Sequence, residues 1–197
     1  MPDMTTPLSI LVDLRAAQFN GDRGIPAFSQ SLALELCRGY PEHRWLLLHD
    51  TRWPSPGRAD ELAACGAWRT AAELEADTGC RIDAVITGCF FLPHHRCDAD
   101  FLLPRWLRLR QPRRLGIVYD LIPWLFPRRY LAGERVRRQY GEGLRLMREY
   151  DRLYAISPCT RRDTIRHAGV DPGRVHCIDG DIDQLKRDLI HLPAATT

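Results

Sequence analysis

The sequence predicts an α/β protein, specifically a Rossmann-like three-layer α/β/α sandwich built on a mainly parallel sheet. Short apolar runs rich in branched side chains alternate with segments of helical periodicity along the chain. Such runs are typical of parallel strands buried on both faces, and the helices between them supply the crossovers. We expect strands at residues 8–14, 45–49, 82–87, 116–120, 152–156 and 174–178, and helices at residues 25–38, 60–66, 71–78, 101–110, 134–150 and 160–168.

The helices are expected from the spacing of their apolar side chains. In the first helix these are Ile25, Phe28, Leu32 and Leu36, and Gly39 follows as a stop signal. In the helix at 101–110, Leu102, Trp106 and Leu109 are expected to face the sheet. In the helix at 134–150, the stripe predicted to enter the core is Val136, Tyr140, Leu144 and Met147.

Length and composition bound the organisation of the chain. The 197 residues suffice for one domain with a sizeable core. We expect this domain at 1–180, with 181–197 as a linker or a truncated terminal segment. No apolar run approaches the roughly 20 residues of a membrane-spanning helix, and residues 1–7 lack the features of a secretory signal. A cytoplasmic protein is therefore expected, with peripheral contact at the inner membrane as a further option.

The seven cysteines are odd in number, scattered, and contain no CxxC pair. In a cytoplasmic protein this indicates reduced, mainly structural thiols. Cys97 lies close to His94 and His95, which raises the alternative of a metal site. Nothing else in the sequence completes a recognisable set of ligands. We therefore expect a plain loop here and no bound metal.

The positive charge is carried almost entirely by arginine, because Lys186 is the only lysine. Two groups stand out: Arg105, Arg108, Arg110, Arg113 and Arg114, and Arg128, Arg129, Arg135, Arg137 and Arg138. The simpler interpretation is solvated helix faces. The alternative is contact with a phosphate-bearing acceptor or an anionic membrane surface. Nucleic acid is not expected, because stacking aromatics are not interleaved with the arginines.

Three strand ends are followed by polar or glycine-rich segments. The run at 116–123 places Asp120 at the carboxyl end of a buried strand, where open α/β sheets bind ligands. Gly24 stands between the first strand and its helix, where a turn and a phosphate-facing backbone are both plausible. Ser157 is a natural N-cap for a helix that has Pro158 at its first position. Asp120 has an alternative role as an acid that caps a loop or helix.

Four segments resemble a known family. They read Gly-Ile-Pro-Ala-Phe at 24–28, Val-Tyr-Asp-Leu-Ile-Pro at 118–123, Ala-Ile-Ser at 155–157 with Thr-Arg-Arg-Asp at 160–163, and Gly-Val-Asp-Pro at 169–172. In this order and spacing they are similar to motifs in the N-terminal half of the GT-B fold glycosyltransferases of family 4. These are retaining enzymes that use nucleotide-sugar donors.

The resemblance implies an acceptor-side domain that moves a hexose onto a glycan or a lipid-linked acceptor, as in polysaccharide biosynthesis. It implies catalytic roles for Asp120 and Tyr119. It also implies substrate-binding roles for Gly24, Ile25, Ser157 and Thr160. No cofactor or metal is implied beyond the nucleotide-sugar substrate. The partner is a C-terminal donor-binding domain with a basic residue and a Glu-x7-Glu pattern, and no such domain follows in this sequence, so the chain alone is expected to be inactive.

The sequence departs from the family at two places. Tyr119 occupies a position where the family commonly has a histidine that contacts the sugar, and Pro158 and Cys159 replace typical acidic and serine-like residues. The alternative function is a non-catalytic module of the same fold that binds a glycan or a partner. A dinucleotide-dependent oxidoreductase is disfavoured, because the GxGxxG glycines are missing.

Overall fold

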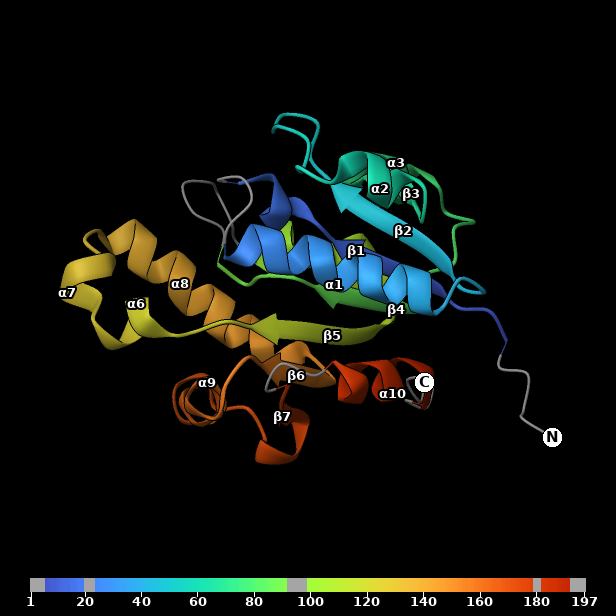
Figure 1. Cartoon of the computed structure of the whole chain (residues 1–197). Coiled ribbons are helices and arrows are strands. Elements are labelled where there is room, and N and C mark those ends of the chain that lie inside the picture. Colours follow the sequence, from blue (N-terminus) through green and yellow to red (C-terminus); the bar gives the residue numbers. More distant parts are fainter. Residues whose placement is uncertain (1–5, 20–23, 92–98, 179–181, 192–197) are drawn as a thin grey trace.

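The computed structural model describes residues 6–19, 24–91, 99–178 and 182–191. It is an α/β structure whose seven-stranded sheet is parallel throughout, with the strand order β3-β2-β1-β4-β5-β6-β7 (Figure 1). The strands are β1 (Ser9–Asp13), β2 (Arg44–His49), β3 (Ala67–Thr70), β4 (Ala84–Thr87), β5 (Arg113–Val118), β6 (Arg152–Ala155) and β7 (Val175–Cys177). The predicted Rossmann-like sandwich is confirmed.

Strand β1 lies at the point where the winding of the sheet reverses. Ile10 pairs with Trp45 of β2 on one side and with Ala84 of β4 on the other. The chain first winds from β1 out to β3, and it then returns to place β4 against the opposite side of β1. In open α/β sheets, ligands bind beyond the carboxyl ends of the strands at such a reversal.

Helices cover both faces of the sheet (Figure 1). One face carries α1 (Ile25–Gly39), α2 (Ala59–Ala63) and α10 (Asp183–His191). The other carries α3 (Ala71–Ala76), α4 (Ala99–Leu102), α5 (Arg105–Leu109), α8 (Glu134–Leu146) and α9 (Pro158–Asp163), which continues into a π-helical turn at Thr164–Ala168. Short 3₁₀ helices lie at Arg15–Gln18, Met147–Glu149 and Pro172–Arg174.

The two-sided burial explains the composition of the strands. Side chains alternate between the faces of a strand, so Leu11 enters the core on one side while Ile10 and Val12 enter the core on the other. A strand buried on both faces has no position for a solvent-facing polar residue, which is why β1 is apolar almost throughout.

All six predicted strands are present, and the structure adds β3 as a seventh. This strand reads Ala-Trp-Arg-Thr, is only four residues long and lies at the edge of the sheet. Its side chains are only partly buried, so it lacks the continuous apolar run of the inner strands. The periodicity of the sequence therefore gave no sign of it.

The helix predicted at 101–110 is wrong, because the structure has two short helices there, α4 and α5, with Pro104 preceding the second. Proline removes a backbone donor and disrupts the helical path, so the register restarts. As a result Leu107 is buried, and Leu109, which was expected to face the sheet, is 72% exposed.

The stripe predicted for α8 is correct in three of its four positions. Tyr140, Leu144 and Met147 are buried, but Val136 is 47% exposed. Figure 1 shows the reason: the start of α8 lies beyond the carboxyl end of β5, beside α6 (Ile122–Leu125) and α7 (Pro127–Tyr130). The first turn of α8 thus has no sheet beneath it.

Of the segment expected to be a linker or a truncated end, residues 183–191 form helix α10. Leu185 and Leu189 are fully buried in the core that α1 shares with the sheet. Asp188 Oδ2 accepts a hydrogen bond of 2.7 Å from the Tyr154 hydroxyl of β6. This helix is therefore part of the packed layer.

Candidate functional site

Tyr119 connects three elements at the carboxyl edge of the sheet. It follows the last residue of β5, and its hydroxyl lies 3.1 Å from Ser29 Oγ in α1. Its backbone carbonyl accepts a 2.9 Å hydrogen bond from Thr160 Oγ1 in α9. The end of β5 is therefore fixed between the second turn of α1, which follows β1, and the first turn of α9, which follows β6.

The close approach of α1 to the sheet depends on a glycine after β4. A Cβ atom on Gly88 would lie 3.0 Å from the carbonyl oxygen of Asp13 and 3.3 Å from Ser29 Oγ. Both distances are tighter than ordinary contacts, so a side chain here would crowd the end of β1 and displace the Ser29 hydroxyl. Gly88 thus allows Ser29 to reach Tyr119.

Gly24 is the N-cap of α1 and has a φ of 60°, in the region that favours glycine. Its carbonyl accepts a 3.0 Å bond from the amide of Phe28, and no side chain caps the helix. Because Pro26 has no N–H, the amides of Ile25 and Ala27 are the first-turn donors without an intrahelical acceptor. A helix start of this kind is suited to phosphate oxygens.

Ser157 is the N-cap of α9, as the sequence predicts. Its Oγ accepts a 3.1 Å hydrogen bond from the amide of Thr160, and Pro158 occupies the first turn. Thr160 is 5% exposed, and its hydroxyl is committed to the carbonyl of Tyr119. We call the end of β5 at Tyr119, together with the starts of α1 and α9, the rim. Ser157 and Thr160 hold α9 against Tyr119 in this rim, and whether they also contact a substrate stays a prediction.

Asp120 is exposed next to Tyr119. Its Oδ1 accepts a 2.9 Å hydrogen bond from the amide of Ile122, which is the loop-capping role weighed above. Within the described parts of the chain, its Oδ2 has no hydrogen-bond partner. One carboxylate oxygen thus fixes the turn while the other remains open to solvent at the rim.

Burial sets the protonation of the two tyrosines at this rim. It raises the pKa of Tyr119 above the ordinary range, and the hydrogen bond with Ser29 offsets only part of that rise. Burial, and next the charge of Asp120, raises the pKa of Tyr140 as well. At neutral pH Tyr119 is therefore a neutral hydroxyl, which can donate or accept a hydrogen bond but does not act as a base.

A buried ion pair that the sequence analysis missed lies at the end of β1. Arg15 Nη2 is 2.7 Å from Asp13 Oδ2, and Arg15 Nε is 2.9 Å from Asp13 Oδ1, so the pair is bidentate. Both residues are under 5% exposed. Arg15 also donates a 2.8 Å bond to the carbonyl of Phe101, and its guanidinium lies 4.2 Å from the centre of that ring. The pair therefore ties the end of β1 to α4.

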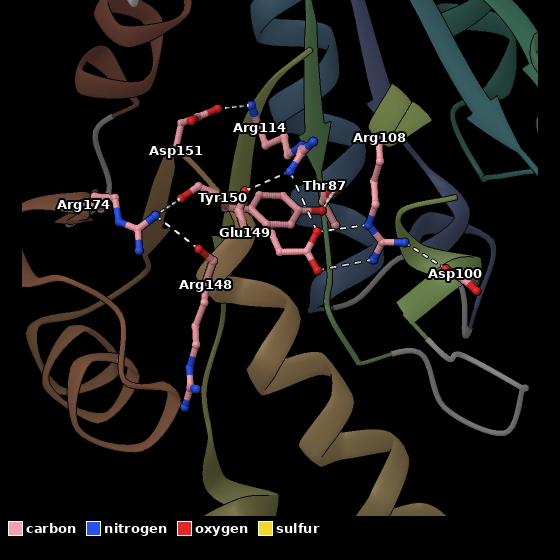
Figure 2. Close-up of polar contacts among 9 residues, drawn as sticks. All are labelled: Thr87, Asp100, Arg108, Arg114, Arg148, Glu149, Tyr150, Asp151 and Arg174. Atoms are coloured by element: carbon pink, nitrogen blue, oxygen red, sulfur yellow. Dashed lines mark hydrogen bonds and ion pairs between the residues drawn. The ribbon is translucent and has the colours of Figure 1, made fainter. Parts of the chain in front are cut away.

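The first arginine group is largely structural. Arg108 and Arg114 both approach Glu149 from different elements, and Arg108 also binds Asp100, as Figure 2 shows. The amide of Arg114 donates to Asp151 at 2.7 Å. Arg110 and Arg113 donate to backbone carbonyls. Most of this group is thus engaged in contacts within the fold. Beside it, the hydroxyls of Thr87 and Tyr150 lie 2.6 Å apart and are buried.

A cavity of about 580 Å³ lies at the carboxyl ends of β2 and β3. Its walls carry aromatic, acidic, basic and neutral polar side chains, among them those of His49, Thr70, Glu75, Asp100, Arg105 and Trp106. A second cavity, of about 450 Å³, lies at the opposite, amino-terminal edge beside Asp83 and Arg113. We consider the first more relevant to function, because it shares the edge of the sheet with the rim.

Of the six predicted site residues, Tyr119, Thr160 and Ser157 are joined by hydrogen bonds. Gly24 and Ile25 begin α1, which reaches Tyr119 through Ser29. Asp120 adjoins Tyr119 through the chain. The residues considered for metal binding, His94, His95 and Cys97, lie outside the described residues. Among the residues that are described, no group of three or more His, Cys, Asp or Glu side chains is arranged to hold a metal. Nor does any helix there have the length and apolar character needed to cross a bilayer.

Comparison of the sequence with known protein families found no match, and comparison with curated proteins found none either. The roles assigned to the rim therefore rest on its residues, its geometry and the motif resemblance.

The ion pair at the end of β1 makes a specific prediction about stability. Asp13→Ala leaves the charge of Arg15 buried and uncompensated, so we expect the free energy of unfolding to fall by about 3–5 kcal/mol. Asp77→Ala, which breaks the partly exposed pair with Arg69, should cost about 1 kcal/mol or less. Urea denaturation followed by circular dichroism measures both. Equal losses in the two variants would contradict the importance assigned to the buried pair.

Proposed function

We propose that this chain is the acceptor-side domain of a retaining glycosyltransferase. In this proposal it moves a hexose from a nucleotide sugar to a glycan or a lipid-linked acceptor, in concert with a donor-binding domain. The observation that carries the proposal is the connection made by Tyr119, which joins the starts of α1 and α9 at one rim. The three motif segments of the resemblance that contain predicted site residues meet at this connection.

The proposal gives each part of the rim a separate task. The open amides at the start of α1, near Gly24, approach the diphosphate of the donor, because a helix start favours negative charge. The neutral hydroxyl of Tyr119 and the open oxygen of Asp120 orient hydroxyl groups of the sugar or the acceptor. Ser157 and Thr160 keep the end of β5 in register with α9.

Glycosyl transfer requires that the sugar and the acceptor hydroxyl be oriented and that the charge on the leaving diphosphate be stabilised. The bond between the anomeric carbon and a diphosphate oxygen breaks, and a bond from that carbon to the acceptor oxygen forms on the same face of the sugar. The proton of the acceptor hydroxyl passes to an oxygen of the leaving diphosphate, on which negative charge develops as its bond to the sugar breaks. Oriented amides that are fixed before the reaction stabilise such charge at no cost in reorganisation. The nucleotide sugar is a substrate, and the proposal includes no resident cofactor or metal.

A second candidate is a non-catalytic glycan-binding module. The cavity beside β2 and β3 favours it, because Trp106 offers an aromatic face and Glu75 and Asp100 offer carboxylates to sugar hydroxyls. In the first proposal the same cavity has room for part of an acceptor glycan. The two candidates differ in whether the rim at Tyr119 takes part.

Asp120→Asn tests the proposed catalytic role in the longest natural form of this chain. We expect turnover of nucleotide sugars to fall by about 10²-fold, the scale of losing one positioned polar contact to reacting groups. Folding should be intact, because asparagine still accepts a hydrogen bond from Ile122. The matched control is Asp171→Asn, since Asp171 caps the amide of Gly173 in the same way at 2.7 Å.

An unchanged rate in Asp120→Asn, or an equal loss in Asp171→Asn, would remove Asp120 from the site. The same assay on residues 1–197 alone should show no transfer, because the donor-binding partner is missing. Measurable turnover by this chain by itself would refute the two-domain form of the proposal.

The glycan-binding candidate is tested at Trp106. If this cavity binds a glycan, Trp106→Ala should raise the Kd for that glycan at least tenfold on the scale of a lost aromatic contact, and Trp106→Phe should retain most of the affinity. Calorimetry with ligands selected on a glycan array measures the change. Glycan binding that is insensitive to Trp106 but lost in Asp120→Asn would instead assign recognition to the rim.

A further inference from the structure

A projecting arm, residues 122–138, extends from the carboxyl edge of the sheet. It consists of α6, α7 and the first part of α8, and Figure 1 shows it beyond the end of β5, at the end of the molecule opposite α10. Apart from Leu131, its residues are exposed or only partly buried. The arm thus offers its side chains to a partner outside this domain.

The arm concentrates exposed apolar side chains. The exposed large hydrophobic residues of the arm are Phe126 (59% exposed), Tyr130 and Val136 (47% each), Ile122 (45%) and Leu125 (37%). Within the described parts of the chain, Leu109 and Ile156 are the only large apolar residues exposed outside the arm. Clustered apolar exposure of this kind marks an interaction surface.

The arm is held in place by its own inward-facing residues. Leu121 and Leu131 are buried at its base and within it. The Trp124 ring is stacked 6.2 Å from Tyr140, and Tyr140 is stacked 3.7 Å from Phe91. Because these contacts fix the backbone, the neighbouring side chains of Leu125 and Phe126 are held outward.

The second arginine group lies on the same arm. Arg128, Arg129, Arg135, Arg137 and Arg138 are all exposed, and Glu134 is the only acidic residue between positions 122 and 138. Within the described residues, none of the five forms an ion pair with a carboxylate. Elsewhere arginines are commonly neutralised, as Arg38 is by Glu61 and Arg108 is by Glu149.

We propose that this arm binds the surface of a membrane that contains anionic lipids. Exposed arginines beside aromatic and branched apolar side chains are the composition of peripheral membrane anchors: the apolar tips enter the interface while the cations meet the lipid phosphates. Aromatic residues and arginine are also enriched at protein interfaces. We commit to the lipid surface because the five exposed arginines far outnumber the single acidic residue of the arm, which suits a surface dense in phosphates.

This inference goes beyond the proposed function, since it stands on exposed side chains and not on sugar transfer. If both hold, the membrane lies beside the rim at Tyr119, because α6 begins three residues after it. The acceptor would then arrive along the lipid surface, and the lipid-linked class of acceptor would be favoured over a free glycan.

Vesicle sedimentation tests the proposal on residues 1–197. We expect binding to vesicles of phosphatidylcholine and phosphatidylglycerol at a 7:3 ratio, little binding to phosphatidylcholine alone, and release as salt screens the charges. The double variant Arg128→Ser/Arg129→Ser should lower the partition coefficient at least tenfold, since each arginine near an anionic surface contributes about a fivefold factor. The double variant Leu125→Ser/Phe126→Ser should lower the partition coefficient at low salt and at high salt, because the loss of apolar contact is not screened.

Matched controls separate the arm from general charge and hydrophobicity. Leu109→Ser removes the most exposed apolar side chain outside the arm, and Arg38→Ser removes one positive charge from the opposite part of the sheet. Both should keep the wild-type affinity for vesicles, and circular dichroism checks folding. Failure of the wild type to bind anionic vesicles, or equal losses in arm and control variants, would overturn the proposal. The assay contains no sugar donor, so a failure of the glycosyltransferase proposal leaves its result unchanged.

Discussion

The arrangement of the candidate site depends on the hydrogen bonds at Tyr119. A parallel sheet places every strand end at one edge, but it does not by itself bring particular loops into contact. Here one residue uses its side chain to reach α1 and its carbonyl to reach α9. Gly88 allows the first of these contacts and the Ser157 cap orients the second. Three segments distant in sequence therefore form a single rim.

Beneath this rim the chain keeps two charges out of water. The Asp13–Arg15 pair is bidentate, and Arg15 is further satisfied by the carbonyl of Phe101. Such a pair adds little net stability compared with apolar residues of the same size, but losing one partner is costly. Its consequence here is geometric: it fixes the end of β1, next to the reversal of the sheet, against α4. Arg15 also lines the cavity beside β2 and β3, so the pair holds the end of β1 in place at that cavity.

The sequence was sufficient to predict the fold, six of the strands and the N-cap at Ser157, because these follow from local periodicity and capping chemistry. It did not predict that Val136 and Leu109 are exposed, since helical spacing says nothing about where the sheet ends or where Pro104 resets the register. It also missed the partnership of Asp13 and Arg15. Two oppositely charged residues after an apolar run look like an ordinary strand end until burial is known.

The central claim is that the starts of α1 and α9 and the end of β5 form one surface that contacts the diphosphate and the sugar of the donor, while tighter donor binding belongs to the donor-binding domain. Nuclear magnetic resonance of residues 1–197, titrated with millimolar nucleoside diphosphate sugars, tests it most directly. The account predicts that the amide signals of Ile25, Ala27, Asp120 and Thr160 shift together along one saturation curve. Shifts confined to the cavity around Trp106, or an unchanged spectrum at the rim, would contradict it.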